Sequence, residues 1–462
     1  MPQLKDKRGL SVTVADEAAR DALDALIDAY VGFRVDTGDR LRAAMKGDAE
    51  APLVQAAAGY IYHLMVLKPL LERAAAASEK ATTLAEEKGD RREQLHAEAL
   101  AAWTAGDLRK AVRLLETILM SWPHDIMALK LAHYLHFYLG DIAEHRDSVA
   151  RVLPAWRPDM PGYAAVLGMR AFGLEEAGDY AAAERFGRRA VELDPSDSWS
   201  VHAVAHVLEM QGRSREGIAW IDGGSADWDG KVHNFANHVW WHKALYHLDL
   251  DEHDAVLELY DTRFRKEETE DGLDIANAAA MLMRLKTRDV ACGDRWDRLA
   301  EVAARKATDH ILPFNDLHML LALSGAGQND RSAAAATALA ARSTADAWTP
   351  VYRDVAGPMA RGIAAYGAGD YGQTVRELAP VRYQWRAIGG SHAPRDVFQQ
   401  LLIDAAMRDE QWRLAQALLA ERTALFPRNA DAGRRAARAS NALGQTERAK
   451  TEAAEAARLA AA

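Results

Sequence analysis

Glycines at turn positions recur along the chain at a nearly constant interval, and this period restricts the possible folds more than any other feature. They follow one another at intervals of 34, 38 and 34 residues, at Gly106, Gly140, Gly178 and Gly212. Around the first and third, a Gly-Asp pair opens a helical stretch with a small residue on its inner face, Ala111 or Ala183, and a proline follows 17 residues after the glycine. A self-similar unit of this length indicates one supersecondary element that repeats.

Further copies extend this pattern through most of the chain. Segments 365–380 and 407–427 repeat it, residues 244–261 form a variant without the glycine, and a degraded copy lies near the C-terminus. A period of about 34 residues with this arrangement is typical of tetratricopeptide repeats, whose helical hairpins stack because none can bury its apolar face alone. We therefore expect an all-α fold, a tetratricopeptide-repeat-like α-solenoid of antiparallel helical hairpins, which can close around a central cavity.

The repeat also bears on domain organisation and on one misleading motif. Residues 1–90 lack clear turn motifs, so we expect an irregular N-terminal helical cap there, continuous as one body with the repeats of residues 91–462. Strand signals are scarce. Residues 367–372, GAGDYG, satisfy the dinucleotide-binding pattern G-x-G-x-x-G, which needs a preceding strand. Since the repeat places them at an interhelical turn, we expect no cofactor there.

Composition narrows the class of protein. The chain has 462 residues, 49% of them hydrophobic, and no run approaches the roughly 18 apolar residues of a membrane span. The first residues lack the features of a secretory signal. A single cysteine, Cys292, fits a reducing compartment, so we expect a cytoplasmic protein. The net charge of −10, with both signs interspersed, argues against nucleic-acid binding.

The segment VHAVAHVLEMQG carries three polar residues, His202, His206 and Glu209, in an otherwise apolar helix. Offsets of zero, four and seven residues place them within roughly 60° of one another on one helix face. In tetratricopeptide folds this face lines the concave surface. We therefore expect the trio to be separated from the core and to carry chemistry, together with His242.

Later segments add more groups of the same kind. Seven of the 16 histidines lie between residues 202 and 253. Imidazoles, carboxyls and aromatic rings suit proton transfer, metal binding or the walls of a small-ligand pocket. Candidate ligand-binding residues come from three segments, and they are His238, Trp241, His310, Asn315, Asp316, His318, Arg395 and Asp396.

Each of these residues also has a structural interpretation. His202, His206 and Glu209 could hold Zn²⁺ or another divalent metal, could serve a metal-free pocket, or could make only structural hydrogen bonds. No established metal signature is present, and no cofactor is identified. Asp309 and Asp316 could cap helices. Arg395 and Asp396 could form an ion pair within or between repeats.

Several segments are not generic repeat consensus and resemble the tetratricopeptide repeat protein 38 family. They run in order from about residue 90 to 425: RREQLHAEAL, DIMALKLAHYLHFYLGD, RDSVARVLPAW, DSWSVHAVAHVLEMQGR, DHILPFNDLHMLL and GGSHAPRDVFQQLLIDAA. The resemblance implies an all-helical repeat protein and little about activity. His392 departs from the residue type expected in animal members.

Two functions remain open at this point. The first is a helical-repeat protein that binds a small ligand in a concave pocket lined by His, Glu, Asp and Arg. Such a pocket could catalyse acid–base or metal-assisted hydrolysis or elimination, as a hydrolase or lyase. The alternative is an interaction scaffold that binds a peptide in the repeat groove. The sequence does not decide whether the chain is an enzyme, nor its oligomeric state.

Overall fold

The predicted Gly-Asp turns are the elements that build this fold. In the computed structural model, which describes residues 2–342 and 344–460, Gly106 and Gly178 have φ of +80° and +83°. The aspartate after each glycine then caps the next helix, because the Asp107 and Asp179 carboxylates accept the backbone N–H of residues 110 and 182. Left-handed φ suits glycine, and the cap satisfies an amide that the helix leaves unpaired.

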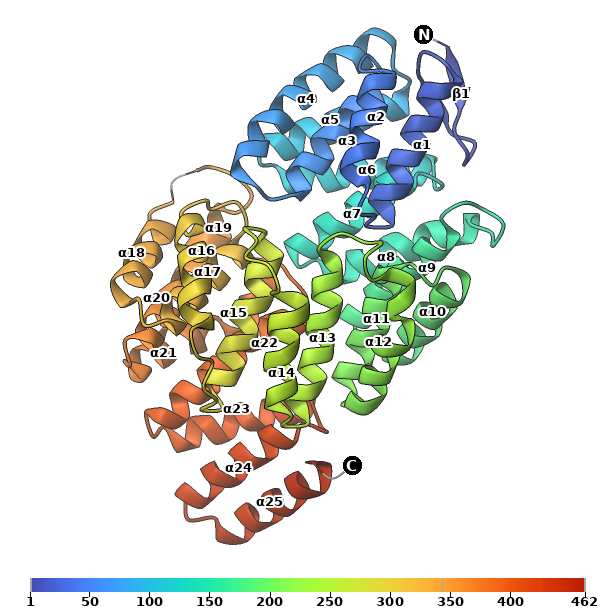
Figure 1. The fold of residues 1–462 in the computed structure, drawn as a ribbon. Helices are drawn as coiled ribbons and strands as arrows, with labels where there is room; N and C mark the ends of the chain where they lie inside the picture. Colours follow the sequence, from blue (N-terminus) through green and yellow to red (C-terminus); the bar gives the residue numbers. More distant parts are fainter. Residues whose placement is uncertain (1, 343, 461–462) are drawn as a thin grey trace. The chain divides into compact units, whose positions relative to one another are not determined.

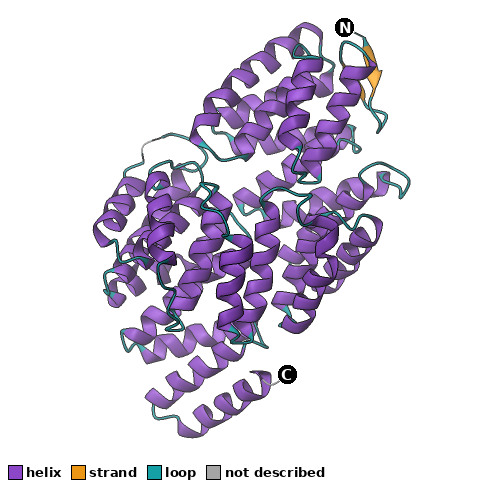
Figure 2. Ribbon diagram, viewed as in Figure 1, coloured by secondary structure: helices purple, strands orange, loops and turns teal. Residues whose placement is uncertain are grey.

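The other predicted turns follow the same rule or replace the glycine. Gly140 and Gly212 also have positive φ, and the small inner residues Ala111 and Ala183 are buried as predicted. In the variant repeat without glycine, Asp251 takes the left-handed conformation with φ of +59°. The all-α, tetratricopeptide-like solenoid class is therefore confirmed, and Figure 2 shows a chain that is helical almost throughout.

Contacts group the chain into two compact units that are interleaved in the sequence. The first unit comprises Met1–Val204, Gly224–Ala236 and Thr344–Thr349, and the second comprises Ala205–Gly223, Asn237–Ser343 and Pro350–Ala462. Helices α11 (Ser198–Met210), α12 (Ser214–Trp228) and α13 (Phe235–Asp249) each run from one group of residues into the other. The cap expected over residues 1–90 stays a prediction.

The elements up to α10 belong to the first unit. They are β1 (Gln3–Lys5), β2 (Ser11–Thr13), α1 (Glu17–Val31), α2 (Thr37–Gly47), α3 (Pro52–Leu64), α4 (Lys68–Lys88), α5 (Arg91–Thr104), α6 (Leu108–Ser121), α7 (Ile126–Leu139), α8 (Ile142–Val152), the 3-10 turn η1 (Leu153–Ala155), α9 (Tyr163–Glu176) and α10 (Tyr180–Leu193). Consecutive helices pack as hairpins, among them α3 with α4, α5 with α6 and α9 with α10.

The elements after α13 belong to the second unit, apart from the first residue of α19. They are α14 (His253–Leu259), the π-helical η2 (Tyr260–Phe264), α15 (Gly272–Lys286), α16 (Arg295–Lys306), α17 (Pro313–Gly325), α18 (Asn329–Ala340), α19 (Thr349–Val351), the π-helical η3 (Tyr352–Ala356), α20 (Gly357–Gly367), α21 (Tyr371–Leu378), the 3-10 segment η4 (Ala379–Ile388), α22 (His392–Arg408), α23 (Trp412–Leu425), α24 (Ala430–Ala442) and α25 (Thr446–Ala460). Helices α24 and α25 form the last hairpin (Figure 1).

The GAGDYG segment and the two short strands are further places where the sequence makes a prediction about the fold. The GAGDYG segment lies at the turn between α20 and α21, with a helix before it as predicted. The sequence did not indicate β1 and β2, which pair antiparallel near the N-terminus. Each strand has only three residues, which is too short for an alternating pattern to be recognised. No helix in the described part of the chain combines the length and apolar character that crossing a bilayer requires.

Candidate functional site

The second unit brings together three of the predicted imidazoles from two helices. His206 comes from α11, and His238 and His242 lie one turn apart on α13. Their ring centroids are 4.4 Å apart for His206 and His242, and 4.9 Å apart for His238 and His242. Trp241 stacks on His238 with its centroid 5.3 Å away. We call His206, His238 and His242 the imidazole cluster.

Two oxygen atoms orient the rings on α13. Nδ1 of His242 lies 2.9 Å from Oε2 of Glu209, and Nδ1 of His238 lies 2.9 Å from Oδ1 of Asn277 on α15. Burial lowers the pKa of His238 to about 3 and holds that of His242 well below its usual range. Burial also raises the pKa of Glu209 to about 8, with a further contribution from Asp249. The low-dielectric surroundings therefore disfavour charge on these groups.

The prediction that the trio on α11 is separated from the core is wrong for both histidines. His202 and His206 are 2% and 0% exposed, so they lie in packed interior. His202 belongs to the first unit, where its ring packs against Phe172 and Trp199 with centroids 5.2 and 5.3 Å away. The helical spacing correctly predicted that the three residues share one face of α11. It could not predict that other side chains bury the two histidines on that face.

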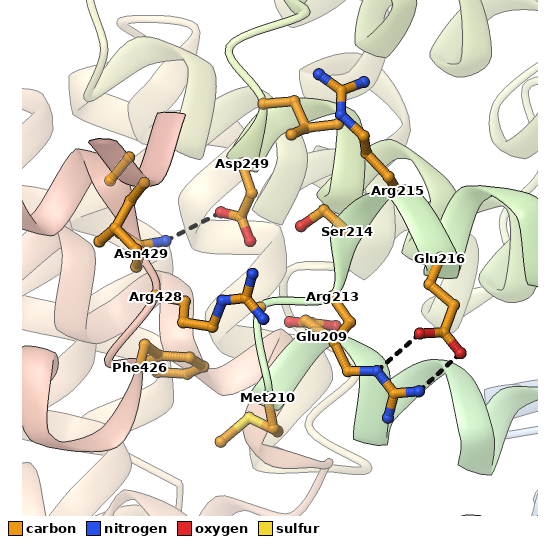
Figure 3. A pocket seen from close by; sticks show the side chains of 14 residues that line it. Glu209, Met210, Arg213, Ser214, Arg215, Glu216, Asp249, Phe426, Arg428 and Asn429 are labelled. Atoms are coloured by element: carbon orange, nitrogen blue, oxygen red, sulfur yellow. Dashed lines mark hydrogen bonds and ion pairs between the residues drawn. The ribbon is translucent and has the colours of Figure 1, made fainter. Parts of the chain in front are cut away.

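Glu209 connects the imidazole cluster to a pocket of the second unit. The pocket has a volume of about 260 Å³, and Figure 3 shows its labelled side chains: Glu209, Met210, Arg213, Ser214, Arg215, Glu216, Asp249, Phe426, Arg428 and Asn429. Asn429 donates to Asp249 over 3.0 Å, and Arg213 pairs with Glu216 at 2.7 Å. Among the described residues, Arg428 has no hydrogen bond or ion pair, so its exposed guanidinium is available to an anion.

Asp249, a half-buried acid of this pocket, predicts that the stability of the protein depends on pH in an unusual way. Burial raises the pKa of Asp249 to about 6, above the value of 3.8 expected in the unfolded chain. Between pH 3.8 and about 6, Asp249 is protonated in the folded state but ionised in the unfolded chain. The free energy of unfolding therefore falls as the pH rises through this range to about 6. We expect Asp249→Asn to stabilise the protein by about 3 kcal/mol more at pH 8 than at pH 4. Denaturant unfolding of both proteins at the two pH values measures this; an equal difference at both would contradict it.

The predicted residues of α17 form a separate group. Tyr352 of η3 donates to Oδ2 of Asp316 over 2.5 Å, and Nδ1 of His310 lies 3.4 Å from the same oxygen. Asn315 lies against Gly272, and Nδ1 of His318 donates to the Phe314 carbonyl over 2.7 Å. These contacts are structural ones, and a ligand role for the four α17-segment residues stays a prediction.

Two of the proposed structural roles need correction. Neither Asp309 nor Asp316 occupies the N-cap of α17, which is Leu312; Asp316 lies inside the first turn, where its side chain accepts from Tyr352 instead. The hypothetical pair of Arg395 with Asp396 is replaced by a longer-range one. Asp396 pairs with Arg422 of α23, while Arg395 donates to the Gly389 and Gly390 carbonyls before α22.

Several residues around the cluster escaped the sequence analysis. Asn277 and Arg284 lie on α15, where the sequence pattern predicts solvent-facing polar positions of an amphipathic helix. They are in fact only 2% and 1% exposed. Arg284 donates to the Ala393 carbonyl over 2.6 Å. Asp249 and Arg428 also went unnoticed as pocket residues. Distant helices bury Asn277 and Arg284 and bring Asp249 and Arg428 to one pocket, and no local sequence pattern contains either effect.

Comparisons with known proteins concern the fold alone. No protein-family profile matches the chain. Similar solved structures include the human IFIT1 dimer with PPP-AAAA, at 13% identity and a TM-score of 0.41, covering 100% of this chain and 98% of that one. The APC/C hetero-tetramer Cut9–Hcn1 is similar at 12% identity and a TM-score of 0.35, covering 96% of this chain and 87% of that one. Yeast Tom70 is similar at 14% identity and a TM-score of 0.33, covering 88% of this chain and 92% of that one. Resemblances this weak carry no argument about ligands.

Proposed function

We propose that the second unit binds a small polar ligand in the pocket lined by Glu209, Asp249 and Arg428. The observation that supports this most is the meeting of two poorly solvated carboxyl groups and an unpaired guanidinium around one hollow. Arg428 would anchor a carboxylate or phosphate, and Asn429 holds Asp249 in place. The pocket is slightly smaller than typical sites for drug-sized ligands, so the ligand is a small one.

Acid–base chemistry in this pocket would fall to the two carboxyl groups. Glu209 faces the ligand space and contacts His242, which gives a proton a route between the pocket and the imidazole cluster. Hydrolysis or elimination is the reaction class that such groups serve without a covalent nucleophile. His202 and His206 are buried and do not line the pocket, so neither takes a direct part in its chemistry. His206 acts only through His242, whose ring centroid lies 4.4 Å away.

The binding proposal is tested by measuring affinity and thermal shift with succinate and inorganic phosphate as probes. We expect Arg428→Ala to weaken binding at least tenfold, because it removes the anchoring charge. Arg413→Ala is the matched control, since this exposed arginine at the start of α23 lies outside the pocket, and it should bind like the wild type.

Other outcomes decide against the small-ligand function. If an acidic peptide binds while neither small probe does, and Arg428→Ala leaves that binding intact, the scaffold alternative is correct. A short single-stranded RNA serves as the control for the expectation that nucleic acid does not bind, which the net charge of −10 supports.

We also propose that the chain is related to the tetratricopeptide repeat protein 38 family. The support is the ordered set of segments between residues 90 and 425, together with the helical-repeat fold. An alignment of this chain with members of that family tests it: Glu209, His242 and Asp396 should align with identical residues.

A further inference from the structure

The imidazole cluster has the donor set of a transition-metal site. The ligand nitrogens of His206, His238 and His242 all lie within 4.8 Å of one another, and all three rings are buried. His238 and His242 are four residues apart, the spacing that places two imidazoles on one face of a helix. The third ligand comes from the neighbouring helix α11, so the three donors approach from two backbones.

The contacts around the cluster are those of an outer ligand shell. Metal-binding histidines commonly donate their second ring N–H to a carboxylate or carbonyl, which fixes the tautomer and leaves the other nitrogen for the metal. Glu209 supplies such an acceptor at Nδ1 of His242, and the Asn277 amide oxygen supplies one at Nδ1 of His238. In the tautomer in which both Nδ1 atoms donate, Nε2 is the ring nitrogen that would bind the metal.

The dimensions of the cluster fit a four-coordinate ion after small movements. Zinc–nitrogen bonds of about 2.0–2.1 Å in a tetrahedron separate the nitrogens by about 3.4 Å. Since the present separations lie within 4.8 Å, each pair of nitrogens needs to approach by at most about 1.4 Å. Three imidazoles without a hard carboxylate ligand favour zinc and its transition-metal neighbours over magnesium and calcium.

We propose that His206, His238 and His242 bind a divalent transition metal, with Zn²⁺ as the first candidate, and that Glu209 and Asn277 orient the ligands. The site differs from the one that the sequence suggested, because Glu209 supports a ligand and is not one itself. This inference does not depend on the pocket ligand.

Metal binding is tested on the full-length protein with the metal alone. Elemental analysis of the purified protein should find close to one zinc per chain, and Zn²⁺ should raise the Tm of chelator-treated protein. Titration with Co²⁺ should produce the visible absorption of a tetrahedral cobalt centre. His206→Gln should weaken Co²⁺ binding at least 100-fold, and Glu209→Gln should weaken it 10–100-fold because the outer shell is lost.

A matched variant separates loss of a ligand from general damage. His318→Gln changes another fully buried histidine of the same unit, whose Nδ1 donates to a backbone carbonyl, and should leave Co²⁺ binding unchanged. Arg428→Ala should also bind Co²⁺ like the wild type, so failure of the pocket proposal remains distinguishable. No zinc and no response to either metal in the wild type would overturn the proposal, as would equal loss of Co²⁺ binding in His206→Gln and His318→Gln.

Discussion

Replacing Asp125 with alanine is expected to lower the free energy of unfolding by about 3–5 kcal/mol, because it leaves a buried arginine without its counter-ion. Oδ2 of Asp125 accepts Nη1 of Arg92 over 2.6 Å and lies 3.0 Å from Nε2 of His96. Arg92 and Asp125 are only 2% and 3% exposed. Oδ1 also accepts the Ala128 amide and caps α7, so one side chain holds two helices of the first unit.

The control for this prediction is Asp107→Ala. Asp107 caps α6 in the same way but is exposed, so its loss should cost only about 1 kcal/mol. Although burial opposes it, His96 and Arg92 hold the pKa of Asp125 below its usual range. Asp125 therefore contributes fully to the free energy of unfolding above about pH 4, and this contribution decreases as the pH falls further. Chemical denaturation at pH 7 gives the comparison; equal losses in the two variants would show that the buried ion pair contributes nothing.

Replacing Arg422 with methionine is expected to have a similar effect in the second unit. Arg422 contacts both carboxylate oxygens of Asp396, with Nη2 3.1 Å from Oδ2, and also donates to Gln399 over 3.0 Å. Arg422 is 4% exposed and the Asp396 side chain 11% exposed, so little of either group reaches solvent. Removal of the guanidinium leaves the Asp396 carboxylate with the Gln400 amide and with Arg284, 4.0 Å away, so we expect a loss of about 3 kcal/mol in denaturant unfolding.

A nearby exposed pair shows what an ion pair contributes without burial. Arg382 lies 3.1 Å from Glu421, the residue before Arg422, and both side chains are about one third exposed. Arg382→Met should cost under about 1 kcal/mol. In the Asp396→Asn background, Arg422→Met should cost about 2 kcal/mol less than in the wild type, because no charge is then stranded. Additive losses would mean that the two side chains are not coupled.

The sequence predicts this fold well wherever local backbone geometry is decisive. Left-handed glycines, aspartate caps and buried alanines are visible in the residues themselves, so the hairpins around Gly106 and Gly178 are predictable. Where Asp251 takes the place of glycine, the sequence still indicates a variant repeat. The two short strands depend on a pairing that three residues cannot signal.

The candidate site is predictable in its residues but not in its surroundings. Helical spacing correctly associates His206 and Glu209, and the histidine-rich segment supplies His238 and His242. Burial of the rings, however, depends on helices far away in the chain. Asp396 has an arginine beside it in the sequence, yet its partner is 26 residues away, because helix packing selects the partner and sequence proximity does not.

The interleaved composition of the two units also constrains how the protein is synthesised. The first unit includes residues 344–349, and Ala347 donates its backbone N–H to the carbonyl of Gly106 over 3.0 Å. A nascent chain released early, or one truncated anywhere before residue 344, therefore lacks part of both units. Ribosomes must therefore deliver roughly three quarters of the polypeptide before the turn between α5 and α6 can complete its native contacts, and until then part of the first unit stays incomplete.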